Sequence, residues 1–555
     1  MERPPDSIAA GARRVGVVAL AAVALAVVMT WPLGSAPGRL GRTSSDGLHS
    51  IWNVSWVAHA LVADPAGLFD ANIFAPHRRT LAYSEANIGA GLVAVPAWWL
   101  TRNPFAAHNS ALIFAFASAF VGMWLLARRL WRDSTSAAIA ALLFAFCPYL
   151  FSHTPHIQLL MIGGIPFAML ALHRLADQPS RRRGVVLGLA LAAQTLSCAY
   201  YGIFAGLMVG YAVLFLAVSR GLWRNRTYWT SVGLGAVVLV ACVLPFFLPY
   251  LDIQQDEGFR RTLADSIRYS ARPASYIASS AHAHRWMLPI ARAWGGWNGE
   301  VLFPGFLAVG LGAAGVFYGL RGGAVSRDRE TVALYGSLGL LAFWASFGPA
   351  AGMYTVLFRA IPLFTFLRAP SRFGLLVTFV LVVLAALALR RLLASLRGRQ
   401  RQMAAAGIGL LALAELNLVP FPWDRAPAPS AAYALLARMP RATVAEFPFY
   451  GERVAFPLHT QYMLFSTAHW MPMVNGYSDH IPTDFRKAAP VLDSFPSRES
   501  FAVMQRYRVR YIGVHWDMYV SRAAEIRERL VPYARYLRPL ASDASMTLYE
   551  IVSYP

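Results

Sequence analysis

Long apolar segments separated by short basic connections fill the first 420 residues of the chain. A helix needs about 20 apolar residues to cross the hydrocarbon layer of a bilayer, so segments of about that size predict transmembrane helices. We place about eleven of them, at residues 15–34, 106–127, 136–150, 156–175, 184–196, 200–218, 229–250, 301–320, 331–347, 373–389 and 403–420. The pattern predicts an all-α polytopic membrane domain.

The arginine-rich connections predict which way this domain faces. With these segments, the clusters fall on one side of the membrane: Arg13/Arg14, Arg128 to Arg132, Arg181 to Arg183, Arg220 to Arg226, Arg321 to Arg329 and Arg390 to Arg401. Basic residues are enriched in cytoplasmic loops. We therefore predict a cytoplasmic N-terminus and an extracytoplasmic C-terminus.

Two apolar segments admit other interpretations. Residues 88–100 are short and contain Pro96, and counting them as a crossing would move the next clusters to the wrong side, so we predict an interfacial or re-entrant helix. Residues 15–34 follow two arginines and could instead be a signal peptide. Their apolar core is longer than a signal sequence needs, and we predict a retained helix.

The remaining pieces of chain are predicted to be extracytoplasmic. They comprise a first outer loop at residues 35–105, a second long loop at 251–300, and shorter loops at 153–156 and 348–372. Residues 421–555 differ in pattern, because short β-branched runs at 443–447, 510–514 and 547–552 alternate with helix-like stretches such as 521–533. We predict two domains: a membrane domain at 1–420 and a small extracytoplasmic α/β domain at 421–555.

Composition supports a membrane protein and excludes a soluble globular one. Of the 555 residues 57% are apolar and only 14% are charged. The net charge of +22 could suggest nucleic-acid binding, but the arginines sit between apolar segments, which indicates membrane topology instead. The three cysteines lie in apolar stretches without ligand-like spacing, so neither a disulfide framework nor a zinc site is indicated.

The first outer loop carries the first candidates for chemistry. Asp46 precedes a helical stretch in which Trp52, Trp56 and Ala60 recur at four-residue spacing, an aromatic face suited to the membrane interface. Asp46 could cap this helix, or it could act as a general base at the membrane surface. His49 and Trp52 on the helix and Glu85 further along the loop are candidate substrate-binding residues, although an exposed acid is often only a solvated one.

Other candidates lie at the outer ends of the predicted spans. His153, His156 and Gln158 are polar groups at the mouth of a span, where they could face a cavity or simply end a helix. Arg368 and Arg372 stand where basic residues are disfavoured, and could bind a lipid phosphate or snorkel among headgroups. Tyr201, beside Tyr200 at an outer turn, fits a sugar site or an aromatic belt.

Taken together, these residues resemble a known class, the polyprenyl-phosphate-sugar-dependent glycosyltransferases of the GT-C superfamily in their bacterial branch. The matching stretches are Asp46 with residues 51–56, and residues 72–77, 156–160, 269–271, 300–305, 368–373 and 474–478. The resemblance covers the layout of most of the chain, and each motif is short.

The resemblance implies a site and a reaction. A first-loop carboxylate would be the catalytic base, and only Asp46 matches that position. The donor would be a polyprenyl-phosphate-linked sugar, with a glycan, lipid or protein as acceptor and the bacterial inner membrane as the location. Family members often show a second acid beside the first, where this chain has Gly47. A divalent cation would therefore need Asp70 or Glu85 to fold back, and no cofactor is otherwise indicated.

Two other functional classes compete with this interpretation. A transporter or flippase of lipid-linked glycans would also need many spans, but such proteins usually show internal repeats, and we find no convincing repeat in the sequence. A GT-C relative that has lost activity and serves cell-envelope assembly is the other alternative, and the absent second acid keeps it open.

Overall fold

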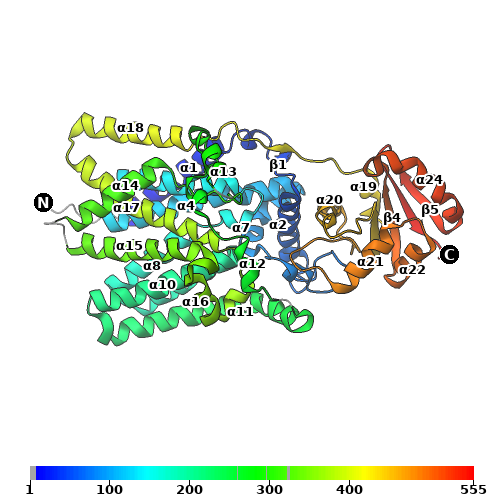
Figure 1. Cartoon of the computed structure of the whole chain (residues 1–555), viewed down its shortest axis with the longest axis horizontal. Helices are drawn as coiled ribbons and strands as arrows, with labels where there is room; N and C mark the ends of the chain where they lie inside the picture. The colour runs from blue at the N-terminus through cyan, green and yellow to red at the C-terminus, as the bar shows by residue number, and fades with distance from the viewer. Residues whose placement is uncertain (1–7, 259, 295–296, 322–325) are drawn as a thin grey trace. The chain divides into compact units, whose positions relative to one another are not determined.

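A computed structural model describes residues 8–258, 260–294, 297–321 and 326–555 (Figure 1). The chain divides into two compact units, and each contains segments from distant parts of the sequence. The membrane unit comprises Met1–Ser35, Leu112–Phe246 and Arg260–Pro422. The sheet unit comprises Ala36–Ala111, Phe247–Phe259 and Trp423–Pro555. It thus joins the first outer loop to the C-terminal part, whereas the boundary predicted near residue 420 follows the sequence order alone and stays a prediction.

Each of the eleven predicted apolar segments is helical in the structure. The helices concerned are α1 Ile8–Met29, α4 Pro104–Trp131, α5 Ser134–Ala145 with α6 Pro148–Ser152, α7 Ile157–Leu160 with α8 Gly164–Asp177, α9 Arg181–Ser197, α10 Ala199–Ser219, α11 Arg226–Glu257, α14 Phe306–Leu320, α15 Ser326–Ser346, α17 Gly374–Ala394 and α18 Gly398–Glu415. Within the described residues, seven stretches are long and apolar enough to cross a membrane, judged by length and composition. The segments of α9, α14, α15 and α18 fall outside these seven because they are shorter or begin with charged turns.

Helix α17 lies at the centre of the membrane unit and is buried along most of its length. Helix α14 runs beside it (Figure 1) and approaches its backbone closely through glycines. A Cβ atom at Gly315 would lie 2.1 Å from the carbonyl oxygen of Leu384, so no larger residue fits there. Small residues that let helix backbones approach are typical of membrane helix pairs. This packing holds α17 in a defined place, and Arg368 and Arg372 lie in the segment that leads into it.

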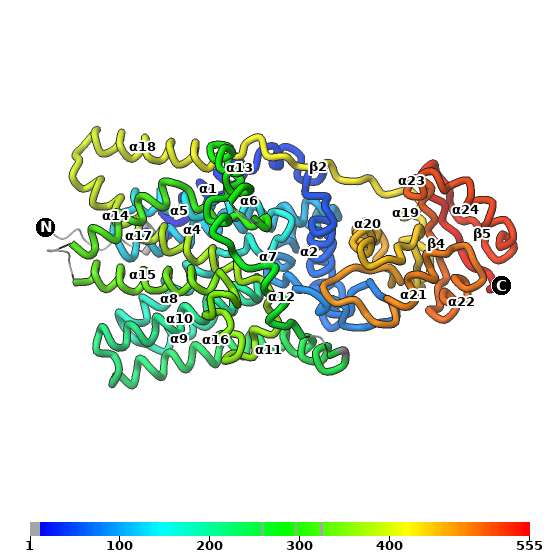
Figure 2. The backbone as a smooth tube through the Cα atoms, viewed as in Figure 1, coloured from blue at the N-terminus to red at the C-terminus, as the bar shows by residue number. Residues whose placement is uncertain are grey.

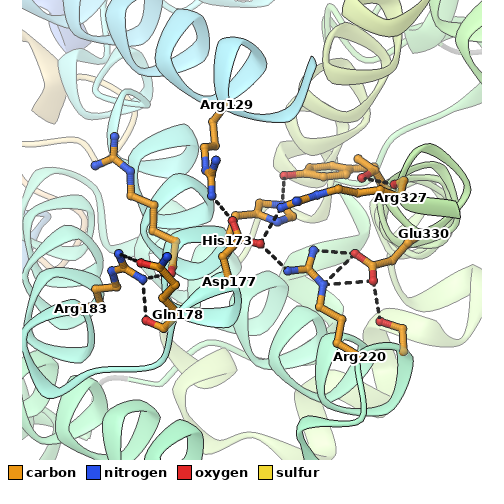
Figure 3. Close-up of polar contacts among 12 residues, drawn as sticks. Arg129, His173, Asp177, Gln178, Arg183, Arg220, Arg327 and Glu330 are labelled. Atoms are coloured by element: carbon orange, nitrogen blue, oxygen red, sulfur yellow. Dashed lines mark hydrogen bonds and ion pairs between the residues drawn. The ribbon is translucent and has the colours of Figure 1, made fainter. Parts of the chain in front are cut away.

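Ion pairs join the arginine-rich connections at one end of this bundle (Figure 3). Asp177 is the last residue of α8, and its carboxylate accepts hydrogen bonds from the guanidiniums of Arg129, Arg220 and Arg327. Arg220 also binds Glu330 at 2.6 Å. These residues lie on four different helices or connections. Only 13% of the Asp177 side chain and 16% of that of Arg220 are exposed, so this pair is shielded from water, whereas Arg327 approaches from the surface.

Two further sets of ion pairs extend this network. Arg390 and Arg391, at the end of α17, bind Asp328 at the start of α15, and Arg401 of α18 binds Asp133 ahead of α5. Four of the six arginine clusters therefore contribute ion pairs at the same end of the bundle. This agrees with the prediction that these connections share one side of the membrane.

The C-terminal part of the sheet unit is the predicted small α/β fold (Figure 2). Its strands are β3 Thr443–Phe447, β4 Val509–His515, β5 Leu537–Ser542 and β6 Met546–Ile551, in the order β3-β4-β6-β5, with β3 and β4 parallel and the other pairs antiparallel. The accompanying helices are α19 Ala432–Leu436, α20 Thr460–Phe465, α21 Thr483–Asp493, α22 Arg498–Arg506, α23 Trp516–Tyr519 and α24 Ala523–Leu530. Strand β5 is an edge strand that the sequence pattern did not predict, because Arg538 and Pro539 interrupt its apolar run.

The first outer loop packs against this fold within the same unit. It contains β1 Leu40–Gly41, α2 Ser45–Ala63 and α3 Ile88–Thr101, and β1 pairs with β2 Asp424–Arg425. The backbone N–H of Ala75 donates to the carbonyl of Met473 at 2.8 Å, and the N–H of Met473 donates to the carbonyl of Asn72 at 2.9 Å. Backbone hydrogen bonds between residues some 400 positions apart therefore hold the loop.

Helix α2 differs from the predicted interfacial helix. Its aromatic face is buried inside the sheet unit, with the Trp56 ring 5.4 Å from that of Trp470 and the Trp56 indole N–H bound to the Leu68 carbonyl at 2.8 Å. The spacing correctly predicted an apolar face. The prediction that this face lies in the membrane interface was wrong, because protein rather than lipid covers it. In α3, by contrast, Leu92 and Leu100 are exposed, as an interfacial helix requires.

Candidate functional site

The ten candidate residues divide between the two units. Asp46, His49, Trp52 and Glu85 belong to the sheet unit, and His153, His156, Gln158, Tyr201, Arg368 and Arg372 belong to the membrane unit. Each group is described in its own unit.

Asp46 lies in the first turn of α2 and is exposed. The helix cap is Ser44, whose hydroxyl accepts the backbone N–H of Gly47 at 3.3 Å. The structure therefore assigns the capping role to Ser44 and leaves the Asp46 carboxylate at the solvent-facing start of the helix. A carboxylate in a first helical turn is favoured by the helix dipole.

Gly47 cannot be replaced by the second acid that related enzymes often carry. A Cβ atom at this position would lie 2.3 Å from the backbone oxygen of Arg42, so the tight turn excludes any side chain. A different acid approaches the turn instead, because the Asp424 carboxylate accepts the backbone N–H of Thr43 at 3.0 Å. Sequence reasoning missed Asp424, since 381 residues separate it from Thr43.

The other first-loop candidates hold the loop together. Trp52 is 1% exposed and its indole N–H donates to Asn72 at 3.1 Å. The His49 ring lies 5.8 Å from Trp52 and 6.1 Å from Tyr477, edge to face with the latter. The backbone carbonyl of Glu85 accepts from the Asn53 amide at 3.1 Å, and its side chain is half-buried. Trp52 therefore has a structural role in this loop.

In the membrane unit, tyrosines hold both candidate arginines. The Arg372 guanidinium stacks on the Tyr200 ring, 3.9 Å from the ring centre, and the Arg368 guanidinium lies 5.1 Å from the centre of the Tyr269 ring. The Tyr200 hydroxyl also accepts the backbone N–H of Arg368 at 2.8 Å. Cation–π contacts of this kind orient a guanidinium without neutralising its charge.

Tyr201 has a different role from its neighbour. It is fully buried, and its hydroxyl donates to the Tyr149 hydroxyl at 2.7 Å. Of the two adjacent tyrosines, Tyr200 is the one that contacts the arginines. The sequence offered no signal to separate them, because the turn between α9 and α10 decides which ring points toward Arg372.

His153 lies close to the hydrogen-bonded tyrosines Tyr149 and Tyr201. Its ring stacks on Tyr149 at 4.1 Å, and its Nδ1 atom is 2.8 Å from the Tyr149 carbonyl, to which an Nδ1–H would donate. Burial, with a smaller contribution from the charge of Arg372, lowers the pKa of His153 to about 3. His153 is therefore neutral at physiological pH.

His156 and Gln158 lie one turn further along, at α7. The backbone N–H of His156 donates to the His153 carbonyl at 2.8 Å, and the Gln158 carbonyl accepts the N–H of Met161 at 3.2 Å. Both side chains are half-buried. The structure thus brings His153, Tyr201 and Arg372 into one neighbourhood, with His156 and Gln158 on the adjoining turn.

Arg372 differs from the arginines at the other end of the bundle. Among the described residues, no carboxylate lies within ion-pair distance of its half-buried guanidinium, whereas Arg220 binds both Asp177 and Glu330. A guanidinium presents five N–H donors and readily binds phosphate or carboxylate in a bidentate manner. Its geometry suits an anionic ligand.

The arrangement of the potential metal-binding residues gives little support for a metal centre. In the part of the chain that the structure describes, no group of three or more His, Cys, Asp or Glu residues is arranged to hold a metal ion. We therefore derive no step through a metal.

Comparisons with known proteins report on the fold. No protein-family profile and no curated protein sequence matches the chain. Among solved structures, a mutant of the arabinofuranosyltransferase AftD from Mycobacteria matches with a TM-score of 0.57 and 16% identity, over 98% of this chain and 42% of that one. The Archaeoglobus fulgidus oligosaccharyltransferase has a TM-score of 0.48 and 14% identity, over 97% of this chain and 74% of that one. ArnT from Cupriavidus metallidurans has a TM-score of 0.40 and 16% identity, over 98% of both chains.

The first of these similarities establishes the architecture. The chain shares the fold of that arabinofuranosyltransferase, with several helices long and apolar enough to cross a membrane and a small C-terminal sheet, which confirms the predicted fold class. It spans less than half the length of the arabinofuranosyltransferase.

Proposed function

We propose that this protein is a membrane glycosyltransferase that moves a sugar from a polyprenyl-phosphate donor to an acceptor hydroxyl. The observation that carries the proposal is Arg372, a half-buried guanidinium that stacks on Tyr200 and has no carboxylate within ion-pair distance among the described residues. Leaving such a cation partly desolvated and unpaired is unfavourable, so the site is suited to a ligand that brings the missing negative charge. A lipid phosphate at the membrane surface is such a ligand.

The proposed reaction is a direct displacement at the anomeric carbon. The acceptor oxygen forms a bond to that carbon while the bond from the carbon to the phosphate oxygen breaks, and the leaving group is the polyprenyl phosphate. Asp46 takes the proton of the acceptor hydroxyl, and Arg368 and Arg372 stabilise the negative charge of the leaving phosphate. The configuration at the anomeric carbon is inverted.

The geometry of the first loop supports Asp46 as the base. Ser44 caps the helix, so the Asp46 carboxylate is not required for capping. The pairing of β1 with β2 and the bond from Thr43 to Asp424 hold the turn in place. A base on an ordered turn keeps its geometry without reorganisation during the reaction.

We place this reaction at the extracytoplasmic face of the bacterial inner membrane. The reason is the distribution of arginines, which assigns the joined connections of the bundle to the cytoplasm and the outer loops and residues 421–555 to the opposite side. The acceptor is a glycan, a lipid or a protein on that side.

The Asp46→Asn variant tests the proposal. The purified protein is incubated with labelled polyprenyl-phosphate sugars, and transfer is measured. General-base catalysis is worth about 10² to 10⁴-fold, so the variant should lose that much activity while its thermal unfolding is unchanged. Asp64→Asn is the matched control, because Asp64 is an exposed acid at the other end of the same helix.

Two results would contradict the proposal. Undiminished transfer by Asp46→Asn would remove Asp46 from the mechanism. Movement of labelled lipid across vesicles with no transfer or donor hydrolysis by the wild-type protein would indicate a transporter instead.

A further inference from the structure

Glu300 lies in a tightly held segment that the proposed reaction does not use. The segment leads into α14, and its backbone is fixed on both sides of the carboxylate. The indole N–H of Trp297 donates to the Glu300 carbonyl at 2.7 Å, and the N–H groups of Leu302 and Phe303 donate to the carbonyls of Ser275 and Ala278 at 2.9 and 3.1 Å. This backbone leaves Glu300 little freedom to move.

The same segment packs against the start of the central helix. A Cβ atom at Gly374 would lie 2.8 Å from Leu302, so the two backbones approach closely there. Glu300 and Arg372 each stand two residues before this contact. The pKa of Glu300 is raised by burial and lowered in part by the Ser371 hydroxyl and by the charge of Arg372, as expected for three neighbouring groups.

The Glu300 carboxylate lies beside the Ser371 hydroxyl and has no cationic partner among the described residues. No Arg, Lys or His among the described residues lies within ion-pair distance of the half-buried Glu300 carboxylate. Ser371 is fully buried, and its hydroxyl lies beside this carboxylate. A carboxylate has about four lone-pair sites, so a single hydroxyl neighbour leaves acceptor capacity for hydrogen bonds from a ligand.

The chemistry of these groups indicates what that ligand is. A carboxylate accepts hydrogen bonds and can take two from neighbouring hydroxyls, while the nearby guanidinium donates to an anion. A sugar phosphate carries both features on adjacent atoms. We propose that Glu300 recognises the donor sugar, accepting hydrogen bonds from its ring hydroxyls while Arg372 holds the phosphate. This inference rests on the proposed function and makes Glu300 a specificity-determining residue.

Binding and transfer measurements on Glu300→Gln test this inference. The probes are sugar-free undecaprenyl phosphate and undecaprenyl-phosphate-linked hexoses, together with their epimers and deoxy analogues. A hydrogen bond to a charged group is worth about 10- to 100-fold, so Glu300→Gln should weaken binding of the preferred sugar-linked lipid by that factor. Discrimination against the deoxy analogue should shrink correspondingly, while binding of sugar-free lipid stays within about twofold of wild type.

Three comparison variants separate recognition of the sugar from other effects. Arg372→Ala should weaken binding of the sugar-free lipid as well as the sugar-linked lipid. Glu499→Gln changes an exposed acid in the first turn of α22 and should alter neither. Glu300→Ala repeats the binding test with a side chain that lacks the amide group of glutamine.

The outcomes distinguish this inference from the proposed function. An equal loss of sugar-free and sugar-linked lipid in Glu300→Gln would overturn the inference, since Glu300 would then act by positioning Arg372. Unchanged discrimination would overturn it as well. If the wild-type protein transfers no sugar yet binds sugar-linked lipid more tightly than bare lipid, and Glu300→Gln abolishes that preference, recognition by Glu300 is supported while the transferase proposal fails.

Discussion

Tyr200 holds Arg372 by its ring and the Arg368 backbone by its hydroxyl. The guanidinium carbon of Arg372 lies 3.9 Å from the ring centre, and the Arg368 N–H is 2.8 Å from the hydroxyl oxygen. One side chain, in the first turn of α10, therefore positions the segment before α17 that carries both basic groups.

This relationship predicts different effects for two substitutions of Tyr200. Tyr200→Leu removes the π face on which Arg372 stacks, and we expect the apparent KM for the polyprenyl-phosphate donor to rise about 5- to 10-fold, in line with cation–π energies at partly buried sites. Tyr200→Phe keeps the ring and loses only the hydroxyl, so its KM should rise less. Steady-state kinetics with labelled donor measures both, and equal KM values for Tyr200→Leu and the wild type would contradict the role given to the ring.

The ion network around Asp177 predicts a large loss of stability when its carboxylate is removed. Asp177→Asn would leave Arg129, Arg220 and Arg327 close together without their shared partner. Removing one member of a shielded ion pair is worth about 3 kcal/mol, and we expect a loss of that order in the free energy of unfolding. Denaturant unfolding in detergent measures it.

An exposed ion pair supplies the comparison for Asp177. Glu525 and Arg529 are 3.2 Å apart on the surface of α24. Exposed pairs at this spacing contribute about 0.5 kcal/mol or less, so Glu525→Gln should be nearly neutral. If Asp177→Asn were equally neutral, the network of Figure 3 would have no role in stability.

A buried histidine predicts that the sheet unit is sensitive to acid. His459 is fully buried, its Nδ1 accepts from the Asn475 amide at 3.1 Å, and burial lowers its pKa from 6.5 to about 3. The folded state thus favours the neutral ring, whereas the unfolded chain binds a proton near pH 6.5. The stabilisation is complete above pH 6.5 and falls as the pH decreases from 6.5 toward 3.

Tryptophan fluorescence of the full chain between pH 7 and 4 measures this dependence. Trp470 and Trp516 report on the sheet unit. His459→Gln should unfold with a smaller dependence on pH than the wild type, since it has no ring to protonate. An identical slope for both proteins would exclude His459 as a cause of acid unfolding.

Most secondary structure could be predicted because it depends on neighbouring residues. Apolar runs between basic clusters located the helices of the membrane unit, and the β-branched run at Thr443–Phe447 located β3. Strand β5 was missed where Pro539 broke the local pattern, since pairing with β6 rather than its own sequence makes it a strand.

The sequence predicted the types of residue in the candidate site better than it predicted their contacts. The positions of Arg368 and Arg372 at the start of a span marked them as unusual, and the structure shows what holds them. It also shows that Tyr200, and not Tyr201, contacts Arg372. Ser44 rather than Asp46 caps α2, and Asp424 binds the backbone of Thr43. Sequence spacing could not identify these contacts. In two cases the competing residues are close neighbours in the same turn, and in the third the two partners are hundreds of residues apart.

The sequence by itself determined that this is a multi-pass membrane protein, where its helices run, and which connections carry the positive charge. These properties follow from local hydrophobicity and charge, which act within a few turns of helix. Only the tertiary structure decided that the first outer loop is hydrogen-bonded to Met473 and Asn475, that Asp177 binds three arginines, and that Arg372 and Glu300 lie near each other without pairing. Such relationships depend on backbone and side-chain contacts between segments far apart in the chain, and these form only when the whole chain has folded.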